Sequence, residues 1–369
     1  MIIIGTGFVI RESKKYRLLV AGALGAVAAA WFCSFARAQP FPSKPVTIVI
    51  PYPISGPTDI RGTHRMTRTY RMIARNAPPS ISDMLARLAA DTIQADTRHP
   101  VVLKRQPGAA TTRGAVAVAR SPADGHTLLL ASNGTMVINP HYFHGVEYDP
   151  ARDFVLVAPL VTMPFVLMAR SDVPAGTPQA LIRWLRPRLG EINYGSSGDG
   201  STGHLAGELF RRMARVSIVH VSFNGGVSAL NGLATRQISL MFAALPLALA
   251  YTPSEYFRPL AVTSPGRVGR LVGVPTLAES GLPELAIEGW YGLFAPAADP
   301  PVATAWVRER IQAALSESAA RTVLESHGLL AATMPHERFA TRIHTESEKW
   351  APVLRASRLP LKDREDGRP

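Results

Sequence analysis

The segment with the most potential for chemistry is the run of glycines and hydroxyl side chains at residues 195–204. Its glycines match the G-x-G-x-x-G spacing that lets a backbone approach the pyrophosphate of a dinucleotide. A dinucleotide site also needs an acid about 20 positions later to bind the ribose, yet no Asp or Glu occurs from Leu209 to Ser254. The segment therefore favours a nest of hydroxyl and backbone N–H groups that binds a carboxylate. A loop that only caps the following helix is the simpler alternative.

The histidines do not indicate a metal site in the sequence. His141 and His144 lie three positions apart, a spacing that metals can use on a helix, but nothing nearby completes a ligand set. His220 lies within an apolar segment and is interpreted as a packed core residue. We therefore expect neither a metal nor a cofactor.

Serine and histidine occur together near residue 200, which leaves a nucleophilic enzyme as an alternative. A secreted serine hydrolase would use Ser197 or Ser201 with His204. The sequence contains no G-x-S-x-G elbow, no P-loop and no H-E-x-x-H motif. We therefore predict no catalytic residue and favour a binding protein.

Strands and helices that could position these residues alternate along the chain. Apolar runs bounded by turn residues alternate with segments of helical period, which is typical of an α/β fold with largely parallel strands. Strands are expected at 46–51, 101–104, 127–131, 154–168, 192–195, 218–222, 238–242, 259–263 and 287–294, and the fourth is long enough for two strands. Helices are expected near 81–95, 109–120, 177–187, 204–214, 225–235, 302–318 and 335–351.

Four polar loops follow these strands, at residues 51–59, 132–140, 195–204 and 222–226. In open α/β sheets, ligands bind beyond the carboxyl ends of the strands, where helix N-termini present free N–H groups and the positive ends of their dipoles. Four such loops, if they converge, can bind an anion without an arginine.

The net charge belongs largely to two short segments. The chain of 369 residues has a formal charge of +13, which suggests an anionic partner such as nucleic acid. Residues 1–38 have the basic, apolar and Ala-Arg-Ala regions of a cleavable signal peptide, and an N-terminal membrane anchor is the alternative. Cleavage removes five basic residues and one acid, which leaves +9, and the five arginines from Arg61 to Arg75 account for five of these nine charges. Nucleic acid is therefore not expected as a partner.

Several segments, taken in chain order, resemble one family. They are Phe41–Pro53 (FPSKPVTIVIPYP), Gly56–Asp59 (GPTD), Ser121–Leu130 (SPADGHTLLL), Ile138–Pro140 (INP), Ile192–Ser197 (INYGSS), Gly200 and Ser201 with His204, Leu260–Ser264 (LAVTS) and Val274–Gly281 (VPTLAESG). In these segments the chain resembles the Bug family of periplasmic solute-binding proteins, the extracytoplasmic receptors of tripartite tricarboxylate transporters.

The resemblance implies a type II, Venus-flytrap binding protein of the periplasm, with two α/β domains, two crossover strands and a ligand cleft between the domains. Domain 1 would comprise residues 39–162 and 258–369, and domain 2 residues 163–257. The protein would be a monomer that captures a small carboxylate and delivers it to the membrane permease of such a transporter. A sensor that presents the closed receptor to a signalling protein is the alternative.

The resemblance also implies which residues bind the ligand, through hydroxyl, amide and backbone groups of the four loops. They are Ser55, Gly56, Thr58 and Asp59 in the first loop, Ser132, Asn133, Thr135 and Asn139 in the second, Ser196, Ser197, Ser201, Thr202 and His204 in the third, and Asn224 and Gly225 in the fourth.

Two departures from the family pattern concern side chains near the expected ligand. The bulky Ile54 lies in the first loop, where the family has small residues. Ala243 and Ala244 replace an acid and an amide, and Leu247 replaces a serine. These changes suggest a ligand with an apolar portion, or weakened binding.

The third departure is an arginine-rich insertion at about residues 60–82. It separates Thr58 and Asp59 from the helix around Asp83, so that either Asp59 or Asp83 takes the family's aspartate position. The insertion could be a solvated loop, a change that disables the site, or a basic lid that recruits anions.

Overall fold

The computed structural model describes residues 41–53, 80–355 and 359–360. The predicted signal peptide, the first-loop residues Ser55, Gly56, Thr58 and Asp59, and the insertion as far as residue 79 lie outside these residues. Every helix and strand named below belongs to one compact unit, Lys44–Pro369. Within the described residues, none of the helices combines the length and the apolarity needed to span a bilayer.

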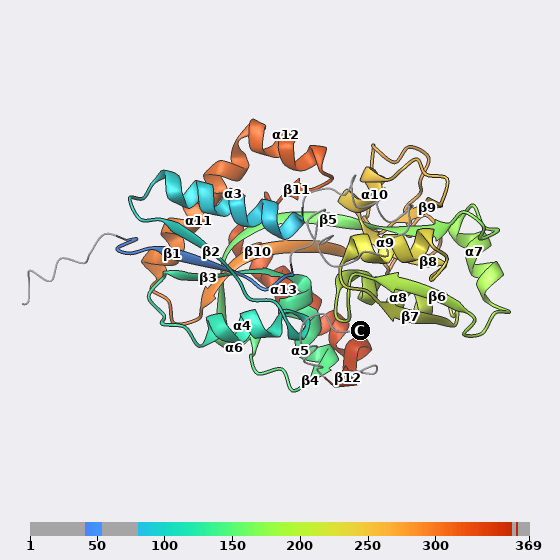
Figure 1. Cartoon of the computed structure of the whole chain (residues 1–369), viewed down its shortest axis with the longest axis horizontal. Coiled ribbons are helices and arrows are strands. Elements are labelled where there is room, and N and C mark those ends of the chain that lie inside the picture. Colours follow the sequence, from blue (N-terminus) through green and yellow to red (C-terminus); the bar gives the residue numbers. More distant parts are fainter. Residues whose placement is uncertain (1–40, 54–79, 356–358, 361–369) are drawn as a thin grey trace, which may run out of the picture. The chain divides into compact units, whose positions relative to one another are not determined.

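One half of the sheet contains three parallel strands and one antiparallel strand. In spatial order the strands are β2 (Val101–Arg105), β1 (Val46–Ile50), β3 (Thr127–Ser132) and the antiparallel β10 (Glu288–Pro296). The helices that pack on this half are α3 (Ile81–Ala95), α4 (Thr112–Ala119), α11 (Pro301–Ser316) and α13 (His336–Arg355). β1 and β3 are buried and apolar, as expected for parallel strands that helices cover (Figure 1).

The other half of the sheet repeats this plan with a second set of elements. Its strands are β6 (Ile192–Ser196), β7 (Ile218–Ser222), β8 (Leu240–Ala244) and β9 (Phe257–Val262). β6 lies between β7 and β8 and runs parallel to both. The helices of this half are α7 (Pro178–Leu185), α8 (Thr202–Met213), α9 (Gly226–Ala234) and α10 (Leu245–Ala250).

A single long strand, β5 (Phe154–Arg170), joins the two halves (Figure 1). Its residues 154–164 pair with β10, and its residues 165–170 pair with β8 and β9. The expectation of two strands in this region was wrong, because the chain changes partners without a turn. Successive side chains point to opposite faces: Leu167 lies in one apolar cluster, and its neighbours Val166 and Met168 lie in the other.

The chain returns to the first half through residues 263–287, between β9 and β10. The hydroxyl of Thr263 fixes this return beside β5, since it accepts the Phe165 N–H at 2.8 Å and donates to the Ile287 carbonyl at 2.6 Å. The change of partners along β5, between Pro164 and Phe165, lies close to the proposed boundary between residues 162 and 163. The division into two domains at residues 162/163 and 257/258 stays a prediction.

Several short elements were not predicted as such, and one of them, η2 (Ala109–Thr111), lies within the helix expected near 109–120. They are η2, the π-helix η3 (Gly134–Ile138), α5 (Asn139–Tyr142), β4 (Phe143–His144), α6 (Pro150–Asp153), α12 (Ser318–Ser326), β11 (Leu330–Ala331) and β12 (Leu359–Pro360). Two of them, η2 and η3, lie at the carboxyl ends of β2 and β3. Of these two, η3 is a single π-helical turn, and such turns are frequent at functional sites.

Candidate functional site

Three of the four predicted loops lie within the described residues, each at the carboxyl end of a parallel strand. We call residues 132–139 the β3 loop, residues 196–201 the β6 loop and residues 222–225 the β7 loop. The first predicted loop is described only as far as Pro53.

The β3 loop and the β6 loop, which come from opposite halves of the sheet, are in direct contact. Thr202, the first residue of α8, donates its hydroxyl hydrogen to Oδ1 of Asn133 at 2.8 Å, and both side chains are buried. Gly200 packs so closely against Asn139 that a side chain at position 200 would collide with the Asn139 amide. The structure therefore brings together Asn133, Asn139 and Thr202.

The β6 and β7 loops lie side by side at the N-termini of α8 and α9. Backbone hydrogen bonds join them, from Gly225 N to Ser197 O at 3.1 Å and from Phe223 N to Ser196 O at 3.2 Å. Ser201 caps α8 by accepting the His204 N–H at 3.3 Å. Among the predicted residues of this region, Ser197 and Asn224 are exposed, whereas Ser196 is fully buried and serves the loop itself.

A cluster of hydroxyl groups that the sequence did not reveal surrounds Thr135 in the β3 loop. The hydroxyl of Thr135 lies 2.8 Å from that of Thr111 and 3.5 Å from that of Tyr52, and Tyr148 donates to the Thr135 carbonyl. Asn139 donates to Thr111 Oγ1 at 3.2 Å. Burial raises the pKa of Tyr52 to about 12, so this phenol stays neutral and can donate a hydrogen bond.

Backbone strain marks the loop that supplies Thr111. Ala109, Ala110 and Thr111 have φ angles of 47°, 51° and 78°, which side-chain-bearing residues rarely adopt. Such conformations cost about 1–3 kcal/mol each and persist where surrounding contacts impose them. The Asn139 amide supplies one such contact, because it donates to the Ala110 carbonyl. The pair Pro107 and Gly108 directly after β2 was the available sequence signal for this fifth loop.

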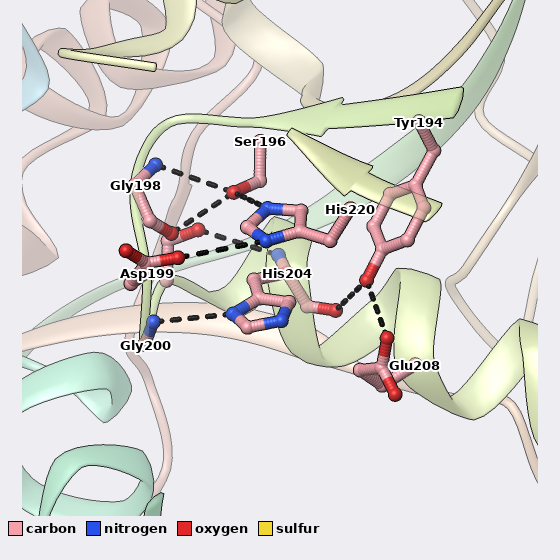
Figure 2. Close-up of polar contacts among 9 residues, drawn as sticks. Tyr194, Ser196, Gly198, Asp199, Gly200, His204, Glu208 and His220 are labelled. Atoms are coloured by element: carbon pink, nitrogen blue, oxygen red, sulfur yellow. Dashed lines mark hydrogen bonds and ion pairs between the residues drawn. The ribbon is translucent and has the colours of Figure 1, made fainter. Parts of the chain in front are cut away.

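Two stacked histidines lie beside the β6 loop and contact it (Figure 2). The rings of His204 and His220 are 3.7 Å apart and nearly parallel, and the Gly200 N–H donates to Nδ1 of His204 at 3.3 Å. Burial lowers the pKa of both rings, and the proximity of His220 lowers the pKa of His204 further. His220 is largely buried, as expected of a core residue whose hydrogen bonds are satisfied, and it contacts Ser196 and Asp199.

The same region contains a serine, a histidine and an aspartate in a row, but the arrangement does not suit catalysis. Ser196 Oγ lies 2.8 Å from Nε2 of His220, and Nδ1 of His220 lies 3.5 Å from Oδ1 of Asp199 (Figure 2). Ser196 has no exposed surface, so a substrate cannot reach its hydroxyl. The predicted alternative used Ser197 or Ser201 with His204; instead, Ser201 caps α8 and His204 Nδ1 accepts the Gly200 N–H.

Two of the residues at which the sequence departs from the family pattern lie in an apolar environment. Ala243 and Leu247 are buried in one hydrophobic cluster with Leu245. Leu247 also covers Gly226, where an added Cβ would lie 3.0 Å from a Leu247 methyl group. Asp83 forms an ion pair with Arg105 at the end of β2.

A cavity of about 500 Å³ lies along α13, and one of its lining residues, Glu288, accepts a hydrogen bond from Asn133 of the β3 loop through its carbonyl at 3.4 Å. Glu288, Arg338, Arg342 and Trp350 are among the residues that line it. Arg342 pairs there with Glu288, which holds α13 against the start of β10, and with Glu346 on α13 itself.

Comparison with known proteins gives one consistent result for the sequence and the fold. Residues 85–359 match the family TctC, the tripartite tricarboxylate transporter family receptor. The UPF0065 protein from the tcbD-tcbE intergenic region of Pseudomonas sp. (strain P51) is 29% identical over 340 residues, which cover 91% of this chain and 94% of that protein. BugT of Bordetella pertussis is 26% identical over 337 residues, covering 91% and 96%.

Two solved structures from Rhodopseudomonas palustris share the fold. Rpa4515, solved with adipate, has a TM-score of 0.72 and 28% identity and covers 86% of this chain and 98% of its own. MatC, solved with malate, has a TM-score of 0.70 and 26% identity, covering 85% and 100%. Members of the matched family are periplasmic solute-binding receptors rather than enzymes. The chain therefore belongs to the tripartite tricarboxylate transporter receptor family and has the mixed α/β fold of its periplasmic binding proteins.

Proposed function

We propose that this protein is exported to the periplasm, captures a small carboxylate between the β3 and β6 loops, and delivers it to the permease of a tripartite tricarboxylate transporter. The observation that carries the proposal is the hydrogen bond between Asn133 and Thr202, which ties the two loops together across the halves of the sheet. Two relatives of this fold were solved with dicarboxylates, adipate and malate.

The electrostatics of the loops suit a carboxylate without a buried cation. α8 and α9 begin at the β6 and β7 loops, and helix N-termini offer unpaired N–H groups and the positive end of a dipole. The hydroxyls of Tyr52, Thr111 and Thr135 lie on the opposite side, at the β3 loop. A carboxylate placed between them exchanges hydrogen bonds with water for hydrogen bonds with these donors.

Ligand capture requires the two loops to separate and close again. Asn133 and Thr202 satisfy each other when the loops touch, so a ligand that enters must replace this hydrogen bond with its own. A ligand that touches both loops shifts the equilibrium towards the closed form only by its difference in affinity for the two forms. The permease would then recognise the closed receptor.

A thermal-shift titration tests this function. The protein is purified after export from a host that carries the full-length gene, and it is titrated with malate, adipate, other di- and tricarboxylates and small aromatic acids. Saturation at 100 times Kd should stabilise the fold by about 2.7 kcal/mol. Thr202→Val should weaken the response and Thr322→Val, an exposed helical threonine, should not. A complete panel without any shift would contradict carboxylate capture.

A further inference from the structure

Three side chains whose atoms can bind a cation lie together beside the β6 loop. Asp199, His204 and His220 each offer one ligand atom, and these atoms lie within 4.8 Å of one another. Figure 2 shows the two rings side by side, with the Asp199 carboxylate beside Nδ1 of His220. The three residues come from the β6 loop, from α8 and from β7, so three separate elements fix the cluster.

The hydrogen bonds of Ser196 permit the tautomer of His220 that a metal needs. A hydroxyl has one hydrogen, and Ser196 Oγ has two acceptors within reach, the Gly198 carbonyl at 2.9 Å and Nε2 of His220 at 2.8 Å. When the hydrogen lies on the Gly198 carbonyl, Ser196 Oγ accepts from Nε2 of His220, as it also accepts the Gly198 N–H at 3.2 Å. In a neutral ring, the proton on Nε2 leaves Nδ1 as a lone pair that faces Asp199 at 3.5 Å.

The proton of His204 is placed in the same way. Nδ1 of His204 accepts the N–H of Gly200 at 3.3 Å, so its proton lies on Nε2. Burial lowers the pKa of both rings, which favours the neutral forms that bind metals. Two imidazole lone pairs and one carboxylate thus lie together with a single long hydrogen bond from Gly200 among them. A cation among them would be attracted by the carboxylate and by both lone pairs.

We propose that Asp199, His204 and His220 form a binding site for a divalent transition-metal ion, with Zn²⁺ the best match to two imidazoles and one carboxylate. Nitrogen ligands disfavour Ca²⁺ and Mg²⁺, which prefer oxygen. The hydrogen bond from Nε2 of His220 to Ser196 is the outer contact that usually orients a metal-binding histidine. A fourth position stays open to water or an incoming carboxylate, because the Asp199 side chain is 36% exposed.

The geometry requires one local change. Tetrahedral ligands at about 2.1 Å from Zn²⁺ lie about 3.4 Å apart, which the 3.5 Å between His220 and Asp199 already matches. The rings stack within 5° of parallel, so their lone pairs run side by side. One ring must turn until its lone pair meets that of the other, and metal binding therefore ends the stacking of His204 on His220.

Cobalt titration of the exported protein tests the site, after treatment with a chelator. We expect one equivalent of Co²⁺ to bind with the visible absorption of a tetrahedral complex, and Zn²⁺ to displace it. Asp199→Asn, which keeps the size and shape of the side chain, should abolish the absorption. Ser196→Ala should weaken binding about 10-fold or more, because it removes the outer contact. The control His344→Ala removes an exposed histidine that pairs with Glu348 on α13 and should change nothing.

A second measurement needs no variant. Nuclear magnetic resonance of the imidazole nitrogens should show two of the 10 histidines shifting on addition of Zn²⁺. The proposal is overturned if no imidazole shifts, if the absorption survives Asp199→Asn, or if His344→Ala removes it. The carboxylate titration described above is run without metal, so a failure of the metal site is distinguishable from a failure of carboxylate capture.

Discussion

The β3 loop and the β6 loop meet in the site, yet different chemistry holds each in place. The β3 loop rests on hydroxyls and amides, with Thr135 at the centre of a cluster that includes Tyr52 and Thr111. The β6 loop rests on His204 and His220, which gain protons as the pH falls. The β3 side of the site therefore keeps its hydrogen bonds as the pH changes, whereas the β6 side responds to protons and, by our inference, to metal ions.

The largest expected effect comes from the point at which the two loops touch. Gly200→Ala adds a Cβ that collides with Asn139 and places it on a backbone with φ of +71°. We expect a loss of about 3 kcal/mol in the free energy of unfolding, from overpacking and strain together, and no thermal shift with carboxylates. Urea unfolding measures the first and a ligand titration the second.

The matched control for that change is Gly145→Ala. Gly145 also has a positive φ, +83°, but an added Cβ there meets nothing within 4 Å. It should cost only about 1 kcal/mol and leave ligand binding intact. Equal losses of stability and of ligand binding at the two glycines would show that the contact between the loops contributes to neither.

The next effect isolates the hydrogen bond between the halves. Thr202→Val keeps the volume of the side chain and leaves Oδ1 of the buried Asn133 without its donor. The expected cost is about 1–3 kcal/mol. A double-mutant cycle with Asn133→Ala measures the coupling, and a coupling near zero would mean that the two loops are held independently.

The two sides of the site should also differ in their response to pH. The folded pKa of His204 and of His220 lies below the unfolded value of about 6.5, so the unfolded chain binds more protons in between. The contribution of these two histidines to stability is therefore fully present above the unfolded pKa, and it is lost as the pH falls through the folded pKa. We expect urea unfolding to show this loss below pH 6.5, and His204→Asn, whose amide oxygen can accept the Gly200 N–H, to reduce it.

One buried carboxyl, that of Asp299, makes the free energy of unfolding depend on pH in the opposite direction, so it must be present in every protein that is compared. Burial raises the pKa of Asp299 to about 6, so its contribution falls as the pH rises towards that value. The comparison is therefore made between His204→Asn and the parent protein, with the exposed His344→Asn as reference. If His344→Asn removes as much of the pH dependence as His204→Asn does, the buried pair is not its source.

The smallest effect concerns strain on the β3 side. Ala110→Gly relieves a φ of 51° and should raise the free energy of unfolding by about 0.5 kcal/mol, because the gain exceeds the entropy that glycine adds to the unfolded chain. Thr111→Gly relieves a φ of 78° but loses the hydroxyl contact with Thr135, so it should destabilise. Destabilisation by both changes would indicate that these conformations carry no strain.

Much of this fold was predictable, because its strands are short apolar runs that end in glycine, serine or proline. The β3, β6 and β7 loops were found in that way, as was α3, which begins at the expected residue. The single strand β5 was not, since its 17 mostly apolar residues exceed an ordinary strand and give no sign of where the partners change.

The contacts inside the site were less accessible to sequence reasoning. Thr111 and Thr135 lie 24 residues apart, and only the packing of β1, β2 and β3 brings their hydroxyls together. The stack of His204 on His220 depends on α8 crossing beside β7, so His220 looked like an ordinary core residue. Sequence patterns report which face of an element is buried, and they do not report which side chains meet there.

The measurement that tests the central claim most directly is calorimetric titration of the exported protein with malate and adipate, alongside Thr202→Val and Thr322→Val. We predict that at least one dicarboxylate binds with a stoichiometry of one, that Thr202→Val weakens its binding, and that Thr322→Val leaves it unchanged. Binding that is equally tight in both variants, or absent from the parent protein, would contradict a carboxylate site between the β3 and β6 loops.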